Sequence, residues 1–164
     1  MTNAHPEHVL TTTAPDLLAF FRRRVSSPED AADLVAETIS AAWRAARRMP
    51  ADREQARMWV FGVAQNTLRH FRRSQMRRDA LTARLAAALD PTPWEDDAEG
   101  VEVRAAVDAL PNELGELLRL VHWDGFSLEQ ASTLMGVPAS TTRSRHARAK
   151  ELLRIAISTP AATD

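Results

Sequence analysis

A dense set of hydrogen-bond donors lies near the C-terminal end of this 164-residue chain, within residues 140–150. An arginine can donate two parallel hydrogen bonds to a guanine edge, and serine, threonine and lysine side chains bind phosphate oxygens. Because an α-helix fits the major groove of DNA, these residue types predict a helix that binds there. The side chains expected to face DNA are Ser140, Thr141, Arg143, Ser144, Arg145 and Arg148.

The surrounding sequence is typical of two helices joined by a tight turn, a helix-turn-helix. Ser127 and Gln130 have the spacing of a capping box at the start of the first helix. Gly136 suits the left-handed backbone just past a helix end, and Pro138 cannot continue the hydrogen-bond ladder. We expect Ser140 to cap the second helix, although a solvated basic helix in an all-α bundle is the alternative. The predicted inward stripe of that helix is Thr142, His146, Ala149 and Leu153.

A second basic surface is predicted on a long helix over about residues 54–78. Like charges one turn apart destabilise a helix unless a polyanion is near, so this surface also indicates nucleic acid. Phe61 is included among the candidate contacts because an aromatic ring can stack on unpaired bases, although core packing is the default interpretation for this residue. The other predicted contacts are Arg57, Asn66, Arg69, His70, Arg72, Arg73 and Arg77.

Two further helices should precede the long one. The first is short and apolar, over residues 17–21. Ser27 and Pro28 favour the start of the second, which should run to about Arg48, because serine caps a helix and proline suits its first position. These elements predict a small helical core beneath the first basic surface.

An acidic edge is expected on the second of these helices. Its apolar stripe should include Leu34 and Trp43, while Asp33 and Glu37 lie one turn apart on the exposed flank. These two carboxylates are either a docking edge for a basic partner or an ordinary solvated face.

The charges are segregated along the chain, although the formal net charge is −1. Residues 1–88 hold 14 basic and 9 acidic side chains, residues 89–113 hold 1 and 8, and residues 114–164 hold 6 and 5. Two basic parts therefore flank an acidic connector. This pattern suits a protein whose two ends bind nucleic acid.

Several classes of function are disfavoured by composition. The chain has no cysteine, which excludes disulfides and thiolate metal sites. It has neither a secretion signal nor an apolar run of membrane-spanning length, so we expect a cytoplasmic protein without direct membrane insertion. We predict no metal site at His5 and His8, no cofactor, no catalytic residue and no small-molecule substrate. His122 and Asp124 are interpreted as an exposed turn pair, not a catalytic dyad.

The predicted fold class is all-α, with two small helical domains joined by an extended acidic linker. Residues 1–14 are expected to form a flexible tail, residues 15–88 the first domain and residues 89–100 the linker. The second domain, residues 101–158, should have a helical pattern broken at Pro111 and should end in the helix-turn-helix.

Three segments resemble the extracytoplasmic-function (ECF) group of bacterial sigma factors. Residues 32–45, ADLVAETISAAWRA, are similar to the family helix that docks on RNA polymerase. Residues 59–73, WVFGVAQNTLRHFRR, are similar to the segment that captures the minus-10 promoter element. Residues 109–149 resemble the family's minus-35 reader, and their order and spacing along the chain also match.

This resemblance implies that residues 15–88 are sigma region 2 and residues 101–158 are sigma region 4. It implies binding to core RNA polymerase through Asp33, Leu34 and Glu37, recognition of promoter DNA, help in promoter melting, and an anti-sigma factor as a partner. The chain departs from the family pattern at Ala36, where glutamine is common, and at His70, where aspartate or asparagine is usual. Further departures are Ser140, Thr142 and His146, where glycine, valine and leucine are usual.

Two other functions stay open on sequence alone. A conventional helix-turn-helix regulator would bind its operator without polymerase, and an all-helical adapter would bind acidic proteins through its basic faces. The receiver domain that such a regulator often carries has no matching strand pattern here. Affinity for promoter DNA in the presence of polymerase would separate the adapter from both other hypotheses.

Overall fold

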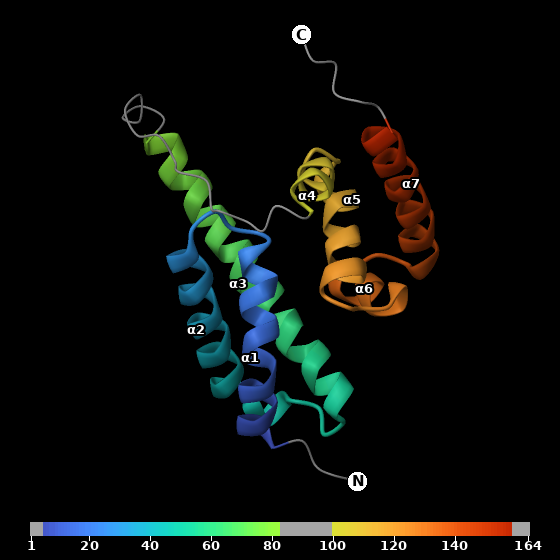
Figure 1. Ribbon diagram of the computed structural model, residues 1–164. Helices are drawn as coiled ribbons and strands as arrows, with labels where there is room; N and C mark the ends of the chain where they lie inside the picture. The colour runs from blue at the N-terminus through green and yellow to red at the C-terminus, as the bar shows by residue number, and fades with distance from the viewer. Residues whose placement is uncertain (1–4, 83–99, 159–164) are drawn as a thin grey trace. The chain divides into compact units, whose positions relative to one another are not determined.

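The computed structural model describes residues 5–82 and 100–158, and every regular element in these ranges is a helix (Figure 1). The chain divides into two compact units, Met1–Trp94 and Glu95–Asp164. The predicted all-α class and two-domain organisation are therefore confirmed. Apart from Gly100, the predicted linker over residues 89–100 lies outside the described residues.

Within residues 5–82 of the first unit, three α-helices pack against one another (Figure 1): α1 (Pro6–Arg22), α2 (Pro28–Arg44) and α3 (Arg53–Thr82). Aromatic rings lie at their centre. Phe20 is fully buried and meets Phe21 and Phe61 edge to face, with ring centroids 5.2 and 5.5 Å apart. Each such pair contributes about 0.5–1.5 kcal/mol beyond the area it buries. These contacts fix how α3 lies against α1.

The N-terminal helix corrects one sequence prediction. Because α1 begins at Pro6, a flexible tail over residues 1–14 is wrong for residues 6–14. Proline suits a first turn, where its missing N–H has no helical acceptor. Pro15 is tolerated inside the helix with its ring exposed to solvent. The buried side chains that stabilise this added length are Val9, Leu10 and Thr13.

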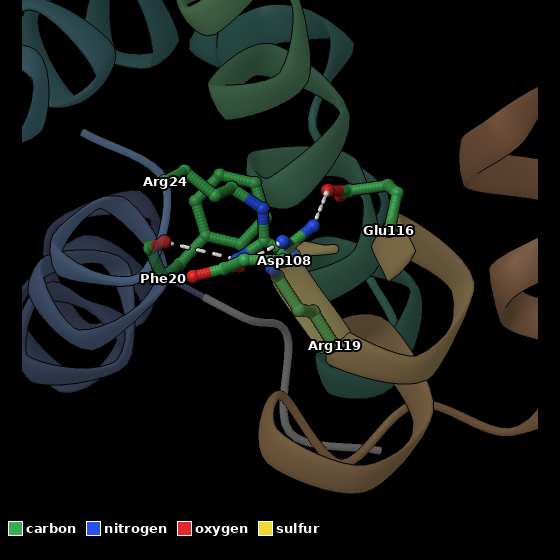
Figure 2. Close-up of polar contacts among 5 residues, drawn as sticks. All are labelled: Phe20, Arg24, Asp108, Glu116 and Arg119. Atoms are coloured by element: carbon green, nitrogen blue, oxygen red, sulfur yellow. Dashed lines mark hydrogen bonds and ion pairs between the residues drawn. The ribbon is translucent and has the colours of Figure 1, made fainter. Parts of the chain in front are cut away.

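The Arg24 side chain stabilises the C-terminal end of α1. Its Nη1 donates to the Phe20 carbonyl oxygen at 2.9 Å, and its guanidinium carbon lies 3.7 Å from the Phe20 ring centroid (Figure 2). A guanidinium over a ring face contributes roughly 0.5–1 kcal/mol at an exposed site. The next helix begins as predicted, because the Ser27 Oγ accepts a hydrogen bond from the Asp30 N–H at 3.2 Å.

The third helix has an aspartate cap. The Asp52 Oδ1 accepts from the Gln55 N–H at 2.9 Å, and its carbonyl oxygen accepts from the Ala56 N–H at 2.8 Å. Between α2 and this cap the chain makes a short 3-10 turn, η1 (Ala46–Arg48). The helix predicted over residues 54–78 is confirmed and is longer than expected, with 30 residues.

In the second unit, residues 100–158 form four α-helices and one π-helical segment (Figure 1): α4 (Val101–Asp108), α5 (Asn112–Leu118), η2 (Arg119–Trp123), α6 (Leu128–Met135) and α7 (Ala139–Ser158). The predicted break at Pro111 is confirmed, since it separates α4 from α5. A small core joins α4, α5 and α7, and its buried members are Val107, Leu114, Leu118 and Ala149.

Arg119 ties α4 to α5. Its guanidinium pairs with Asp108 at the end of α4 and lies 3.7 Å from the Glu116 Oε2 (Figure 2). Gly115 allows the two helices to come this close, because a Cβ atom there would lie 2.9 Å from the Val107 carbonyl oxygen. Any side chain at this position would push α4 and α5 apart.

Candidate nucleic-acid interface

The first helix of the helix-turn-helix is α6, and its capping box is present. The Ser127 Oγ accepts from the Gln130 N–H at 3.1 Å, and the Gln130 Oε1 accepts from the Ser127 N–H at 2.9 Å. Gly136 follows the last residue of α6 with φ 67° and ψ 33°, the left-handed conformation that glycine favours. There the Val137 N–H donates to the Ser132 carbonyl oxygen at 3.1 Å. The predicted start and stop of this helix are confirmed.

The second helix, α7, begins two residues earlier than a cap at Ser140 would allow. The Pro138 carbonyl oxygen accepts from the Thr142 N–H at 3.0 Å and from the Thr142 Oγ1 at 3.2 Å. Because α7 begins at Ala139, Ser140 lies inside the first turn, and its assignment as the cap is wrong. The Ser140 side chain is exposed there, where a groove contact would require it.

The buried residues on one side of α7 determine which side of the helix faces solvent. Thr142 and Ala149 are fully buried, while His146 and Leu153 are half-buried. Ala149 and Leu153 pack into the core shared with α4 and α5. A helix anchored in this way presents its opposite side to solvent.

The predicted groove contacts on α7 divide into two groups. The Arg145 Nη2 lies 3.0 Å from the Glu113 Oε2 on α5, and only 29% of its side chain is exposed. Thr141 is also half-buried. The exposed members are Ser140, Arg143, Ser144 and Arg148.

The second basic surface lies on α3. One helix side carries side chains that can donate to phosphate oxygens at helical spacing. Arg72 is half-buried on this surface and takes part in a further contact within the chain. Its exposed members are Asn66, Arg69, His70, Arg73 and Arg77.

Two predicted contacts on α3 have roles in the core instead. Phe61 is 1% exposed and packs against Phe20, so its assignment to base stacking is wrong for this conformation. The Arg57 guanidinium carbon lies 4.8 Å from the Phe61 ring centroid, and its Nη2 lies 3.3 Å from the Asp16 Oδ2. Helical spacing places both residues on the side of α3 opposite to Asn66 and Arg73, and the structure shows that this side contacts α1.

The acidic edge on α2 is present, with Asp33 and Glu37 both exposed. Leu34 is 2% exposed, so it supports this edge from the core and is not available as a polymerase contact. Trp43 was predicted in the buried stripe, and this is wrong, because it is 55% exposed. Trp43 lies on the margin of the stripe, in line with the half-buried Val35 and Ile39, whereas its neighbour Ala42 lies at the centre of the stripe and is fully buried.

Two kinds of site are absent from the described ranges. No helix within residues 5–82 or 100–158 is long and apolar enough to cross a membrane. The same residues include no group of three or more histidine, aspartate or glutamate side chains arranged to hold a metal ion.

Models of two known protein regions match this chain. Sigma-70 region 2 matches residues 9–78, and Sigma-70 region 4 matches residues 100–153. The first covers α1 to α3, and the second covers the helix-turn-helix with the helices before it. The fold and the two basic surfaces therefore define a sigma-70 protein with these two regions.

Two individual relatives show to which group of sigma-70 proteins the chain is most similar. The ECF RNA polymerase sigma factor EcfG of Rhodopseudomonas palustris (strain TIE-1) is 30% identical over 152 residues, which cover 88% of this chain and 80% of that protein. SigE of Mycolicibacterium smegmatis is 29% identical over 139 residues, 80% of this chain and about half of that protein, 53%. The chain belongs to the family of ECF RNA polymerase sigma factors. Members of this family are transcription initiation factors and not enzymes.

A solved structure supports the fold assignment. The sigma factor RpoE of Bartonella quintana, crystallised with the anti-sigma factor NepR, aligns with a TM-score of 0.70 at 22% identity. The alignment covers 94% of this chain and 97% of that chain. The two-unit helical architecture is therefore shared by both proteins.

Proposed function

We propose that this chain binds core RNA polymerase, brings it to a specific set of promoters and helps to open the DNA there. The observation that carries the proposal is the exposed polar row on α7, held outward by a buried stripe and preceded by a capped α6 and the Gly136 turn. In a sigma-70 region 4 module this helix would enter the major groove of the upstream promoter element.

The basic surface of α3 is assigned to the downstream element. Arg69, Arg73 and Arg77 are exposed at four-residue spacing, so they lie on one side of the helix, and this matches a run of phosphates along a strand. We assign the holding of the separated strand to this surface. Arg57 and Phe61 act indirectly, by fixing α3 against α1.

The acidic edge of α2 is assigned to polymerase binding. Asp33 and Glu37 present two carboxylates one turn apart, and the exposed Trp43 ring lies further along the same helix. Tryptophan is enriched among the residues that dominate protein–protein binding energy. A basic surface on the polymerase is the chemistry that would complement these carboxylates.

An anti-sigma factor is the second proposed protein partner. The sigma factor RpoE of Bartonella quintana was solved with one, and the fold of this chain is similar. Because polymerase and promoter DNA are the proposed targets, we place the working protein in the cytoplasm.

The polymerase contact can be tested with one double variant. Asp33→Lys with Glu37→Lys should weaken binding to purified core polymerase by about tenfold or more, because both charges of the acidic edge are reversed. Fluorescence titration of the labelled full chain against core enzyme measures this affinity. Glu7→Lys, which reverses an exposed acid on α1, is the matched control.

Circular dichroism should show an unchanged helix content in the double variant, because both side chains are exposed. Full affinity for core enzyme in a folded double variant would contradict the assignment of the acidic edge. Operator binding by the wild-type chain without polymerase would instead support a conventional regulator.

A further inference from the structure

Two histidine side chains from distant parts of the second unit meet. His122 lies in η2 and His146 lies on α7, 24 residues later. Their Nε2 atoms are 3.2 Å apart, within hydrogen-bond distance. The ring centroids are 5.4 Å apart and the ring planes differ by 17°.

This geometry describes an in-line hydrogen bond. The distance between the two ring centroids exceeds the distance between the two Nε2 atoms by about two ring radii. The Nε2 atoms of His122 and His146 therefore lie between the two rings and point toward each other. A bond between two imidazole nitrogens needs one N–H donor and one lone pair, and therefore at least one neutral ring. When both rings are protonated, two N–H groups and two positive charges face each other, and the contact becomes repulsive.

The backbone holds both rings in place. His122 belongs to a π-helical segment in which the Asp124 N–H donates to the Arg119 carbonyl oxygen at 2.9 Å. The next turn closes with the Phe126 N–H donating to the Leu120 carbonyl oxygen at 2.9 Å. His146 lies on the inward stripe of α7, half-buried between Thr142 and Ala149.

The surroundings of His146, through burial and nearby charges, favour its neutral form. Burial, the neighbouring His122 and Lys150 one turn later on α7 lower the pKa of His146, in that order. Several carboxylates on the elements packed against α7 already have cationic partners: Glu113 pairs with Arg145, and Asp108 and Glu116 pair with Arg119. The other ionisable groups on these elements and the adjoining turn are Glu102, Arg104, Asp124 and Glu129.

We propose that His122 and His146 form a proton-controlled clasp, in which His122 is a positioning residue that holds α7 against η2 and acid opens the contact. The clasp joins the N-terminal half of α7 to the segment that leads into α6. It therefore sets how the two helices of the helix-turn-helix lie against each other. This inference does not depend on the DNA or polymerase contacts proposed above.

The direction of the pH effect follows from proton linkage. A histidine whose pKa is lower in the folded than in the unfolded state binds more protons when unfolded. Its contribution to stability is complete above the unfolded pKa of about 6.5 and is lost as the pH falls through that value toward the folded pKa. The second unit should therefore lose stability on mild acidification.

The decisive experiment follows the imidazole nitrogens by NMR in the labelled full chain between about pH 5 and pH 8. His146 should titrate below the ordinary histidine range, as its burial and its contact with His122 require. In the variant His122→Gln, the His146 midpoint should rise, because a neutral amide replaces the cationic neighbour and can accept its N–H. His8→Gln on α1 is the control and should leave the His146 midpoint unchanged.

Two results would overturn the clasp. An unchanged His146 midpoint in a folded His122→Gln variant would remove the coupling between the rings. If that variant does not fold, the wild-type titration still decides, because a His146 midpoint within the ordinary histidine range would contradict the clasp.

Thermal denaturation at each pH gives a second readout. Acidification should lower the melting temperature of the His122→Gln variant by less than it lowers that of the wild-type chain. An equal loss in both proteins would count against the clasp.

Discussion

At the scale of single residues, the basic side chains differ in whether they already pair with a carboxylate of the same chain. Arg57 and Arg145 each have a carboxylate at about 3 Å, Asp16 and Glu113 respectively. A guanidinium engaged in this way gives up its partner before it can bind a base edge. Arg143 and Arg148 are exposed on the outer side of α7, so we expect them to contribute more to sequence recognition.

The variant Arg143→Ala tests this division. It should weaken binding of the polymerase complex to the upstream promoter element by about 1–3 kcal/mol if the side chain reads a base. Arg145→Ala should have a smaller effect, because its guanidinium is held by Glu113. Competition footprinting at a stated salt concentration measures both, since phosphate contacts depend strongly on salt. A large loss for Arg145→Ala with none for Arg143→Ala would reverse the assignment.

At the scale of helices, the turn between α6 and α7 depends on one backbone conformation. Gly136 has φ 67°, and a Cβ atom there would meet no heavy atom within 4 Å. A substitution at this position is therefore disfavoured by its own backbone and not by a neighbour. Gly62, inside α3, also has open space around a Cβ atom and has a helical conformation.

Alanine substitutions at these two glycines should change the free energy of unfolding in opposite directions. Gly136→Ala should lower the free energy of unfolding by about 1–2 kcal/mol, the cost of a left-handed conformation with a Cβ atom. Gly62→Ala should raise it by about 0.5–1 kcal/mol, since alanine favours a helix interior more than glycine does. Urea denaturation of the full chain measures both variants. Equal effects of the same sign would contradict the role given to the Gly136 turn.

Local signals in the sequence predicted much of this architecture. The Ser127 and Gln130 capping box, the Gly136 turn and the start at Ser27 depend on residues a few positions apart, and all are present. The tail over residues 1–14 was expected because chain ends are often loosely ordered, whereas the burial of Val9, Leu10 and Thr13 stabilises residues 6–14 as part of α1.

The remaining differences depend on contacts between distant residues. Helical periodicity placed Trp43 on the apolar stripe of its helix, but it does not say how much of the stripe's margin the neighbouring helices cover. Phe61 was assigned to base stacking from its chemistry, whereas its burial depends on its contact with Phe20 of α1. The pair of His122 and His146 likewise requires the packing of η2 against α7, which no local pattern specifies.

At the scale of the whole molecule, the chain combines two helical units with separate basic surfaces. The first carries α3 and the acidic edge of α2, and the second carries the helix-turn-helix. Sigma-70 regions 2 and 4 match these two units in the same order. Two separate basic surfaces on one chain suit the proposed contact with two promoter elements at once.

The most direct test of this account is run-off transcription from genomic fragments with purified core RNA polymerase, with and without the chain, at a stated salt concentration. We predict discrete start sites that require the chain and disappear when Asp33→Lys is combined with Glu37→Lys. An unchanged transcript pattern on addition of the chain, together with sequence-specific DNA binding in the absence of polymerase, would contradict the proposed function.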